Sequence, residues 1–151
     1  MSLQRKHLQV RAFALAARFS NWLLALPDRL LPPPVRLLRI GTAFWQSRAL
    51  HTAAQLDIAS VLGDRALTLD ELVVQLQADR DALQRLLRML AAMGVFERGR
   101  DGLYRNSAAS HYLRADHPGS VRAMVCMHNS PEMSRPWFDQ LTPGLRTGRA
   151  P

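Results

Sequence analysis

The chain has 151 residues and a mass of 17.0 kDa, with 48% hydrophobic and 21% charged residues, which favours one compact domain and excludes wholesale disorder. Its single cysteine, Cys126, excludes an internal disulfide framework and a cysteine-based zinc finger, so a cytoplasmic location is expected. Most of the net charge of +8 lies in residues 1–50, which contain eight basic residues and one acidic residue. No apolar run is long enough for a transmembrane helix.

Residues 3–26 are predicted to form an amphipathic helix with a wide apolar stripe, followed by a proline-rich linker that ends near residue 37. A helix this apolar needs a partner to cover it, which could be the rest of the fold, a second subunit or a lipid surface. The basic charge could contact nucleic acid, an anionic membrane or an acidic partner, although arginines on solvated helix faces are the simpler interpretation.

Apolar periodicity predicts a helix over residues 35–56 and a short helix over residues 57–62, closed by Gly63. Thr68 followed by Glu71 is a capping-box pattern, in which each side chain bonds the other residue's backbone amide. It predicts that the next helix begins at residue 69.

Asp79 is predicted to cap a helix over residues 80–93, and Gly94 to end it in a left-handed conformation. Two short runs around the turn at residues 99–102 then predict a β-hairpin. Residues 66–106 therefore have the helix–helix–hairpin order of a winged helix-turn-helix. Further helices are expected over residues 107–113, 119–127 and 131–145, so the predicted fold is mainly α with a short β-hairpin wing and additional N- and C-terminal helices.

A winged helix suggests DNA binding, and the chain offers arginines on its second helix and its wing. Residues 66–106 nevertheless hold six arginines and six acidic residues, whereas a DNA-reading unit usually keeps a basic surface. We therefore expect no nucleic-acid binding, and a winged-helix transcription regulator is the alternative hypothesis. The five histidines have no metal-ligand spacing, and no glycine-rich nucleotide loop is present, so no metal site is expected.

Three stretches resemble the N-terminal domain of bacterial and plant-type S-adenosylmethionine-dependent O-methyltransferases. The matching segments are Ala53–Leu62; Leu69–Leu72 with Leu83–Leu90 and Gly94–Phe96; and Ser110, Leu113–Arg114, Pro118–Arg122, Trp137 and Leu141. The central stretch alone also occurs in bacterial winged-helix regulators, and the flanking segments make the likeness more specific. The likeness covers roughly residues 38–149.

The resemblance implies that residues 38–151 form a winged-helix dimerisation domain, interlocked with a second subunit, that also acts as a lid over the small-molecule acceptor. It also implies substrate contacts by two residues that precede the tryptophan, Met127 and His128. Three more side chains could line the same wall, although a role in the core is the simpler interpretation for them: Met124, Trp137 and Phe138.

The family's cofactor loop and catalytic residues have no counterparts in these 151 residues, so we assign no catalytic and no cofactor-binding residue. The expectation is a homodimer that does not transfer a methyl group by itself, with S-adenosylmethionine implied only for the complete enzyme. Association with a separate methyltransferase catalytic chain is a further possibility.

Overall fold

The computed structural model describes residues 31–149, and the expected N-terminal helix over residues 3–26 lies outside them. The chain divides into two compact units, residues 1–43 and 44–151. The described part of the first unit is mostly the start of helix α2 (Pro33–Gln55). That start exposes several apolar side chains: Val35, Leu37, Leu38 and Ile40.

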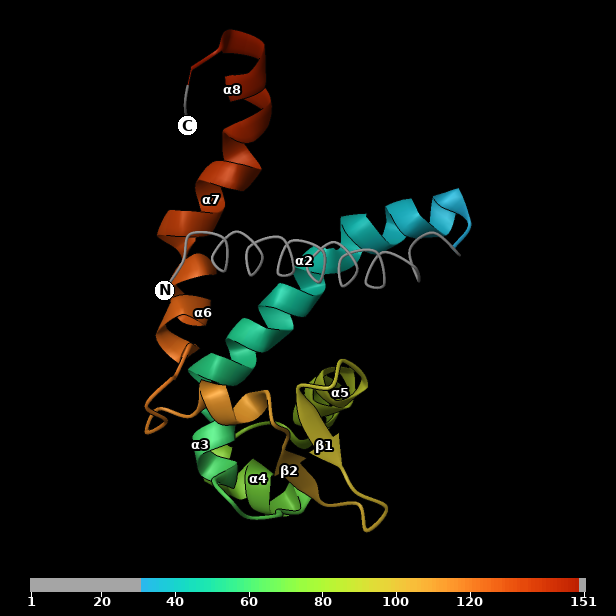
Figure 1. The fold of residues 1–151 in the computed structure, drawn as a ribbon, viewed down its shortest axis with the longest axis vertical. Coiled ribbons are helices and arrows are strands. Elements are labelled where there is room, and N and C mark those ends of the chain that lie inside the picture. Colours follow the sequence, from blue (N-terminus) through green and yellow to red (C-terminus); the bar gives the residue numbers. More distant parts are fainter. Residues whose placement is uncertain (1–30, 150–151) are drawn as a thin grey trace, which may run out of the picture. The chain divides into compact units, whose positions relative to one another are not determined.

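The second unit contains a small body made of three helices and a hairpin (Figure 1). The body is built from α3 (Ile58–Leu62), α4 (Leu69–Leu76), α5 (Arg80–Ala92), β1 (Phe96–Arg98) and β2 (Tyr104–Asn106). The two strands pair antiparallel, and Leu67 joins them by an isolated bridge to Tyr104. The helix–helix–hairpin order predicted for residues 66–106 is therefore confirmed.

The local start and stop signals act as predicted. Thr68 accepts from the Glu71 amide while the Glu71 carboxylate accepts from the Thr68 amide, so the capping box is complete. The Thr68 amide, and after it the Thr68 hydroxyl, donate to the Glu71 carboxylate and lower its pKa below the usual range. The Asp79 side chain accepts from the Ala82 amide at 2.8 Å. Gly94 ends the α5 segment with a φ of 73°, a conformation that glycine adopts without steric cost.

The hydrophobic core lies inside this body. Leu72, Leu87 and Leu90 are fully buried, and the hairpin contributes Phe96 and Tyr104. The end of α2 joins the core through Ala49 and Ala53. Because apolar burial is the dominant favourable term in folding, this body holds most of the stability that the described chain can draw from its own interior.

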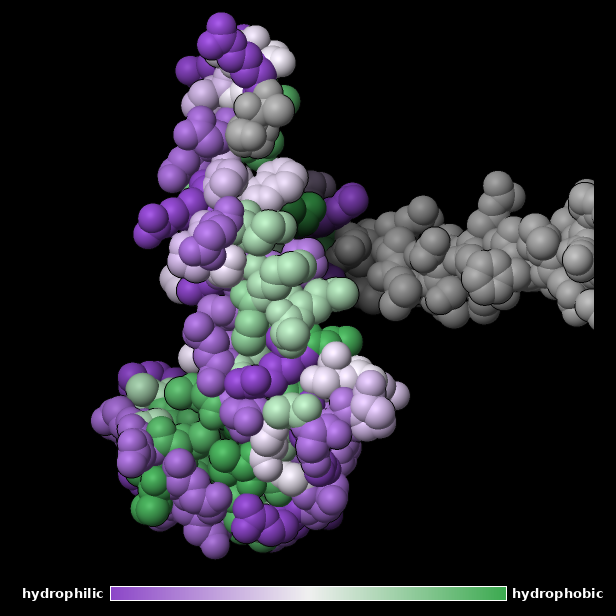
Figure 2. All heavy atoms as spheres, turned by 90° about the vertical axis from the view of Figure 1, so that its left-hand side faces the viewer, coloured by the Kyte–Doolittle hydropathy of each residue, from purple (hydrophilic) through white to green (hydrophobic). Residues whose placement is uncertain are grey.

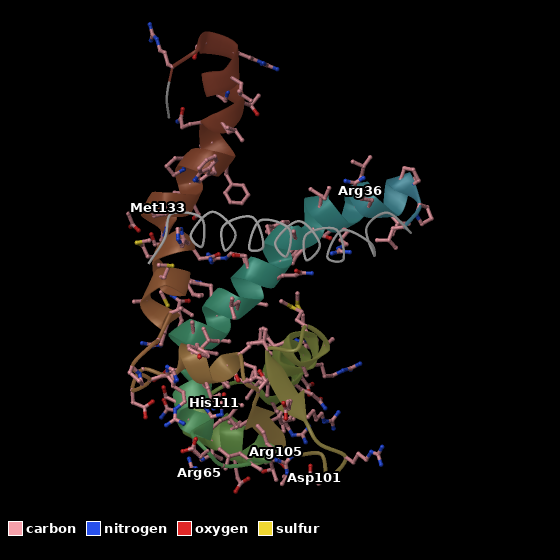
Figure 3. The ribbon with its side chains drawn as sticks, in the orientation of Figure 1. Arg36, Arg65, Asp101, Arg105, His111 and Met133 are labelled. Carbon is pink, nitrogen blue, oxygen red and sulfur yellow. The ribbon has the colours of Figure 1, made fainter. Side chains whose placement is uncertain are left out.

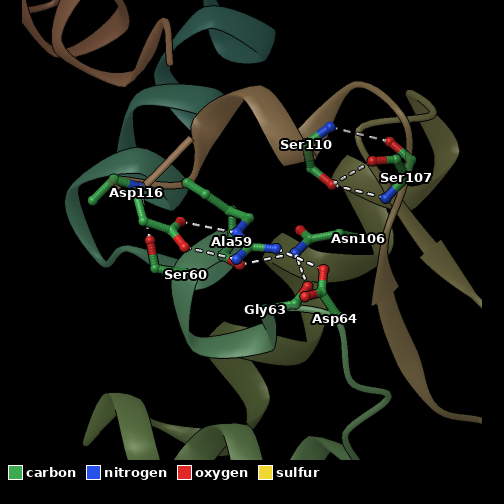
Figure 4. Close-up of polar contacts among 10 residues, drawn as sticks. Ala59, Ser60, Gly63, Asp64, Asn106, Ser107, Ser110 and Asp116 are labelled. Carbon is green, nitrogen blue, oxygen red and sulfur yellow. Dashed lines mark hydrogen bonds and ion pairs between the residues drawn. The ribbon is translucent and has the colours of Figure 1, made fainter. Parts of the chain in front are cut away.

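Polar contacts connect the end of β2 and the segment after it to α3 and the residues that follow α3 (Figure 4). Asn106 Nδ2 donates to the carbonyl oxygens of Ala59 and Gly63, each at 2.8 Å. Arg114 pairs with both Asp64 and Asp116. The guanidinium holds the pKa of Asp116 below its usual range. These contacts set where the chain leaves the body.

The C-terminal segment differs from the prediction in three places. The helix expected over residues 107–113 is only a short 3₁₀ turn, η1 (Ser110–Leu113), because the Ser107 hydroxyl accepts from the amides of Ala109 and Ser110 instead. The helix expected at 119–127 is α6 (Arg122–His128). Its start is delayed because the Val121 amide donates to the Tyr112 carbonyl at 2.8 Å.

The helix expected over residues 131–145 is two helices, α7 (Pro131–Asp139) and α8 (Leu141–Thr147), which meet at Gln140. Pro143 explains the break, because its ring clashes with the carbonyl four residues earlier and it has no amide to donate. Neither helix, nor α6, contains a buried residue.

Candidate functional site

A groove of about 690 Å³ lies between the C-terminal half of α2 and the segment that joins α6 to α7. Its size falls within the range of small-molecule pockets, about 300–1,000 Å³. The lining residues are Phe44, Ser47, Arg48, His51 and Gln55 from α2; Cys126, His128 and Asn129 from α6 and its end; and Ser130, Pro131, Ser134, Arg135, Trp137 and Phe138 from α7 and its cap.

Asn129 holds the two walls of the groove together. Its side-chain Nδ2 donates to the Ser47 hydroxyl at 3.0 Å, and its carbonyl accepts from Arg48 Nη1 at 2.7 Å. At the other end of α6, Arg122 Nε donates to the Ala54 carbonyl at 2.8 Å and pairs with Asp57 at 3.2 Å. Contacts at both ends of α6 therefore fix its position against α2.

His51 is the most deeply buried of the polar groups in the groove, with 5% of its surface exposed. Burial is the main cause that lowers the pKa of the imidazole, and the positive charge of Arg48 adds to it. The imidazole is therefore neutral at pH 7. Its Nδ1 atom is buried and has no hydrogen-bond partner, which is uncommon for a buried polar atom.

The groove combines aromatic surface with positive charge. Phe44 contacts Phe138 edge to face, with ring centroids 6.4 Å apart, and Trp137 lies beside them in the lining. The charged groups of the lining are Arg48 and Arg135, and no lining residue is acidic. The groove is therefore suited to a flat molecule that carries polar oxygen atoms.

Three of the five side chains proposed as substrate contacts from the sequence line this groove: His128, Trp137 and Phe138. Met124 and Met127 also lie on α6 but outside the lining, and both are exposed. Trp137 and Phe138 are exposed as well, so the structure does not place them in the core, the simpler role considered for them.

Sequence reasoning missed the α2 wall. Phe44, Ser47, Arg48, His51 and Gln55 recur at helical spacing, so they share one face of α2. The sequence alone could have shown this face, because the spacing of its aromatic and polar residues is helical. The sequence did not indicate which other element packs against this face.

A second cavity, of about 260 Å³, lies on the hairpin body and includes Arg65, Arg105 and His111 in its lining. Figure 3 shows these residues low on the body, apart from Met133 of α7. Arg105 pairs with Asp101, and the lining of this cavity also includes the acidic Asp64, whereas the lining of the groove has no acidic residue. This cavity therefore carries more neutralised charge than the groove.

Two of the arginines considered for DNA contact form ion pairs within the chain. Arg80 pairs with Asp70 at 2.8 Å, and Arg105 pairs with Asp101. Within residues 31–149, no three His, Cys, Asp or Glu residues are grouped as a metal site. Over the same range, every helix is too short or too polar to cross a membrane.

Residues 38–116 match the family model of the O-methyltransferase dimerisation domain. The chain belongs to this family. A phenazine O-methyltransferase from Lysobacter antibioticus is 33% identical over 105 residues, which are 70% of this chain and 30% of that protein. The dimerisation domain described here thus spans about a third of the length of that relative.

Solved structures agree with this assignment. The crystal structure of LaPhzM has a TM-score of 0.72 and 30% identity, and the match covers 79% of the dimerisation domain chain and 35% of the LaPhzM chain. The structure of CalO1, a methyltransferase of calicheamicin biosynthesis in its SAH-bound form, has a TM-score of 0.66 and 29% identity, covering 77% of this chain and 34% of CalO1.

Proposed function

We propose that the dimerisation domain forms a homodimer through α2 and the helices α6 to α8, in an interlocked arrangement of the winged-helix type. We also propose that its groove forms one wall of the acceptor site in an S-adenosylmethionine-dependent O-methyltransferase that acts on a small molecule. The cofactor is assigned to the complete enzyme. The domain itself is assigned two roles, formation of the homodimer and contact with the acceptor.

The observation that carries the dimer is the apolar surface that the described chain leaves uncovered. Figure 2 shows apolar side chains as a pale green band along the helices α6 and α7. The exposed large apolar residues of the four helices are Val35, Leu37, Leu38, Ile40, Phe44 and Trp45 on α2, and Met124, Met127, Met133, Trp137, Phe138, Leu141 and Leu145 on α6 to α8. Exposed large apolar side chains in such number mark an interface, and identical chains usually associate symmetrically.

The acceptor wall is supported by the chemistry of the groove. We assign acceptor contacts to His128, Trp137 and Phe138, which line it. Met124 and Met127 are assigned contacts from the exposed face of α6, where flexible thioether side chains adapt to a flat molecule. A separate catalytic chain that binds the domain would use the same surfaces as a second copy.

Sedimentation velocity tests the dimer. We expect the 151-residue chain to sediment as a dimer at about 10 µM. The double variant Leu38→Glu/Ile40→Glu places two charges on the exposed face of α2 and is expected to be monomeric. Val74→Glu is the matched control, because Val74 is equally apolar and exposed but lies on α4. A wild-type chain that remains a folded monomer at this concentration contradicts the proposal.

A further inference from the structure

The charges of the hairpin body are not equally available to a partner. Residues 66–106 hold six arginines and six acidic residues, and this balance underlies the expectation that nucleic acid does not bind. A count of charges does not show which of them are already paired, whereas the structure does. Four of the six acidic side chains accept hydrogen bonds from groups within the body: Asp70, Glu71, Asp79 and Asp101.

Most of the arginines, in contrast, remain available. Two of the six, Arg80 and Arg105, form ion pairs. Within residues 31–149, the other four have no carboxylate or carbonyl partner, and all four are exposed. Arg98 lies over the Tyr104 ring, with its Cζ atom 5.7 Å from the centroid, a contact that leaves its N–H groups free to donate. The four are Arg85 and Arg88 on α5, Arg98 on β1, and Arg100 in the turn after β1.

The two elements that carry these arginines are neighbours. The helix α5 packs against β1, and the turn between β1 and β2 projects beyond them (Figure 1). Arg85 and Arg88 are three residues apart, so they are adjacent on the surface of α5. They lie on the side opposite to the buried Leu87 and Leu90. Helix and turn therefore present their unpaired positive charge to solvent.

The two remaining acidic residues lie at the margins of this surface. Glu97 precedes Arg98 on β1, and successive strand residues point to opposite faces. Glu97 is therefore on the other face of the hairpin, where Arg105 is its partner in the strand register. Asp81 is in the first turn of α5, one turn before Arg85, and would repel an anion at that end of the helix.

The shape of this surface favours a nucleic-acid duplex over an acidic protein. The helix α5 has 13 residues and is about 20 Å long, and the major groove of B-DNA, about 12 Å wide, admits one helix. A turn that projects beside the helix is placed to reach the phosphates that border the groove. Guanidinium groups pair with phosphate oxygens through two parallel hydrogen bonds.

We propose that α5 and the turn after β1 bind duplex DNA, with the middle of α5 in the major groove and the four unpaired arginines on phosphate groups. The binding is mainly to the backbone and depends little on base sequence. This second function uses no residue of the groove lining or of the proposed dimer surface, so it does not rest on the proposed function.

Fluorescence anisotropy of the 151-residue chain with a short labelled duplex of mixed sequence tests the proposal. We expect a Kd of about 10⁻⁴ to 10⁻⁶ M at physiological salt, as for backbone binding in general. Four phosphate contacts, each releasing about 0.9 counterion, predict that the Kd rises about 150-fold between about 50 and 200 mM KCl.

Variants locate the contacts. Arg85→Gln/Arg88→Gln removes two of the four, so the rise in Kd over the same salt range should fall to about 12-fold. Arg100→Gln removes one and should leave a rise of about 40-fold. Arg146→Gln is the matched control, because it removes the same charge from an exposed side chain on α8, and it should behave as the wild type. Circular dichroism checks that each variant is folded.

Every other outcome overturns the inference. Absence of binding at about 50 mM KCl does so directly, and a salt dependence unchanged in Arg85→Gln/Arg88→Gln places the DNA on other basic residues. A single strand that binds more tightly than the duplex excludes the position of α5 in the major groove. Displacement of the duplex by poly-L-glutamate at an equal concentration of charge identifies an acidic polypeptide as the occupant. The proposed dimer and acceptor wall stand in each case.

Discussion

The hairpin body and the C-terminal helices use apolar residues in opposite ways. In the body, α3, α4 and α5 together bury seven residues, among them Leu72, Leu87 and Leu90 at 0% exposure. In α6, α7 and α8 no residue is buried, although methionine, tryptophan, phenylalanine and leucine are frequent there. The body is stabilised from within, whereas the C-terminal helices carry surface for binding. Three predictions test this contrast.

The largest effect is expected in the core of the body. Leu90→Ala removes a fully buried side chain and is expected to lower the free energy of unfolding by about 2–5 kcal/mol. Leu145→Ala on α8 is the matched control, because Leu145 is 80% exposed, and a change within about 0.5 kcal/mol is expected there. Urea denaturation in the monomeric Leu38→Glu/Ile40→Glu background measures both, because Leu145 belongs to the proposed dimer surface and dimerisation would add to the apparent stability. Equal losses would refute the contrast.

A smaller effect is expected at the start of α4. Thr68→Ala removes the hydroxyl that accepts from the Glu71 amide and is expected to cost about 1 kcal/mol in the free energy of unfolding. Thr52→Ala serves as the control, because the Thr52 hydroxyl donates to the Arg48 carbonyl within α2 and caps no helix end. If both substitutions have the same effect in urea denaturation, the capping box does not contribute as assigned.

The smallest effect is expected at His51, where α2 enters the core. Burial lowers the pKa of this imidazole below its ordinary value of 6.5, so the unfolded chain binds a proton more readily than the folded chain. Stability is therefore present above pH 6.5 and is lost as pH falls toward the lowered pKa. The difference in unfolding free energy between wild type and His51→Gln should shrink from pH 7.5 to pH 5. A difference that stays constant across this range would show that the histidine does not titrate as described.

The body was predictable because its signals are local. The Thr68–Glu71 capping box, the Asp79 cap and the left-handed Gly94 each act within four residues, and the three- and four-residue spacing of leucines on α5 identifies its buried face. The C-terminal boundaries were less predictable, since apolar periodicity continues through residues 131–145 even though Pro143 interrupts the backbone. Pro143 was the signal for that break, although Pro136 lies inside α7 without ending it.

The groove was harder to predict because it depends on pairing between distant segments. His128, Trp137 and Phe138 were found from the family resemblance, and the structure places them in the lining. The burial of His51 and the contacts of Ser47 and Arg48 with Asn129 arise only when α2 packs against the end of α6. Periodicity can identify a face of a helix but not the element that covers it.

The hydrogen bond from Arg48 to the Asn129 carbonyl joins residues 81 positions apart, and the whole hairpin body lies between them in the chain. Closing a loop of that length has an entropic cost, which the packed body reduces because it already brings the two ends near each other. The native groove thus depends on the folded body that brings its two walls together. A molecule bound there resists unfolding of the entire second unit, so its occupancy can be followed by melting temperature as well as by titration.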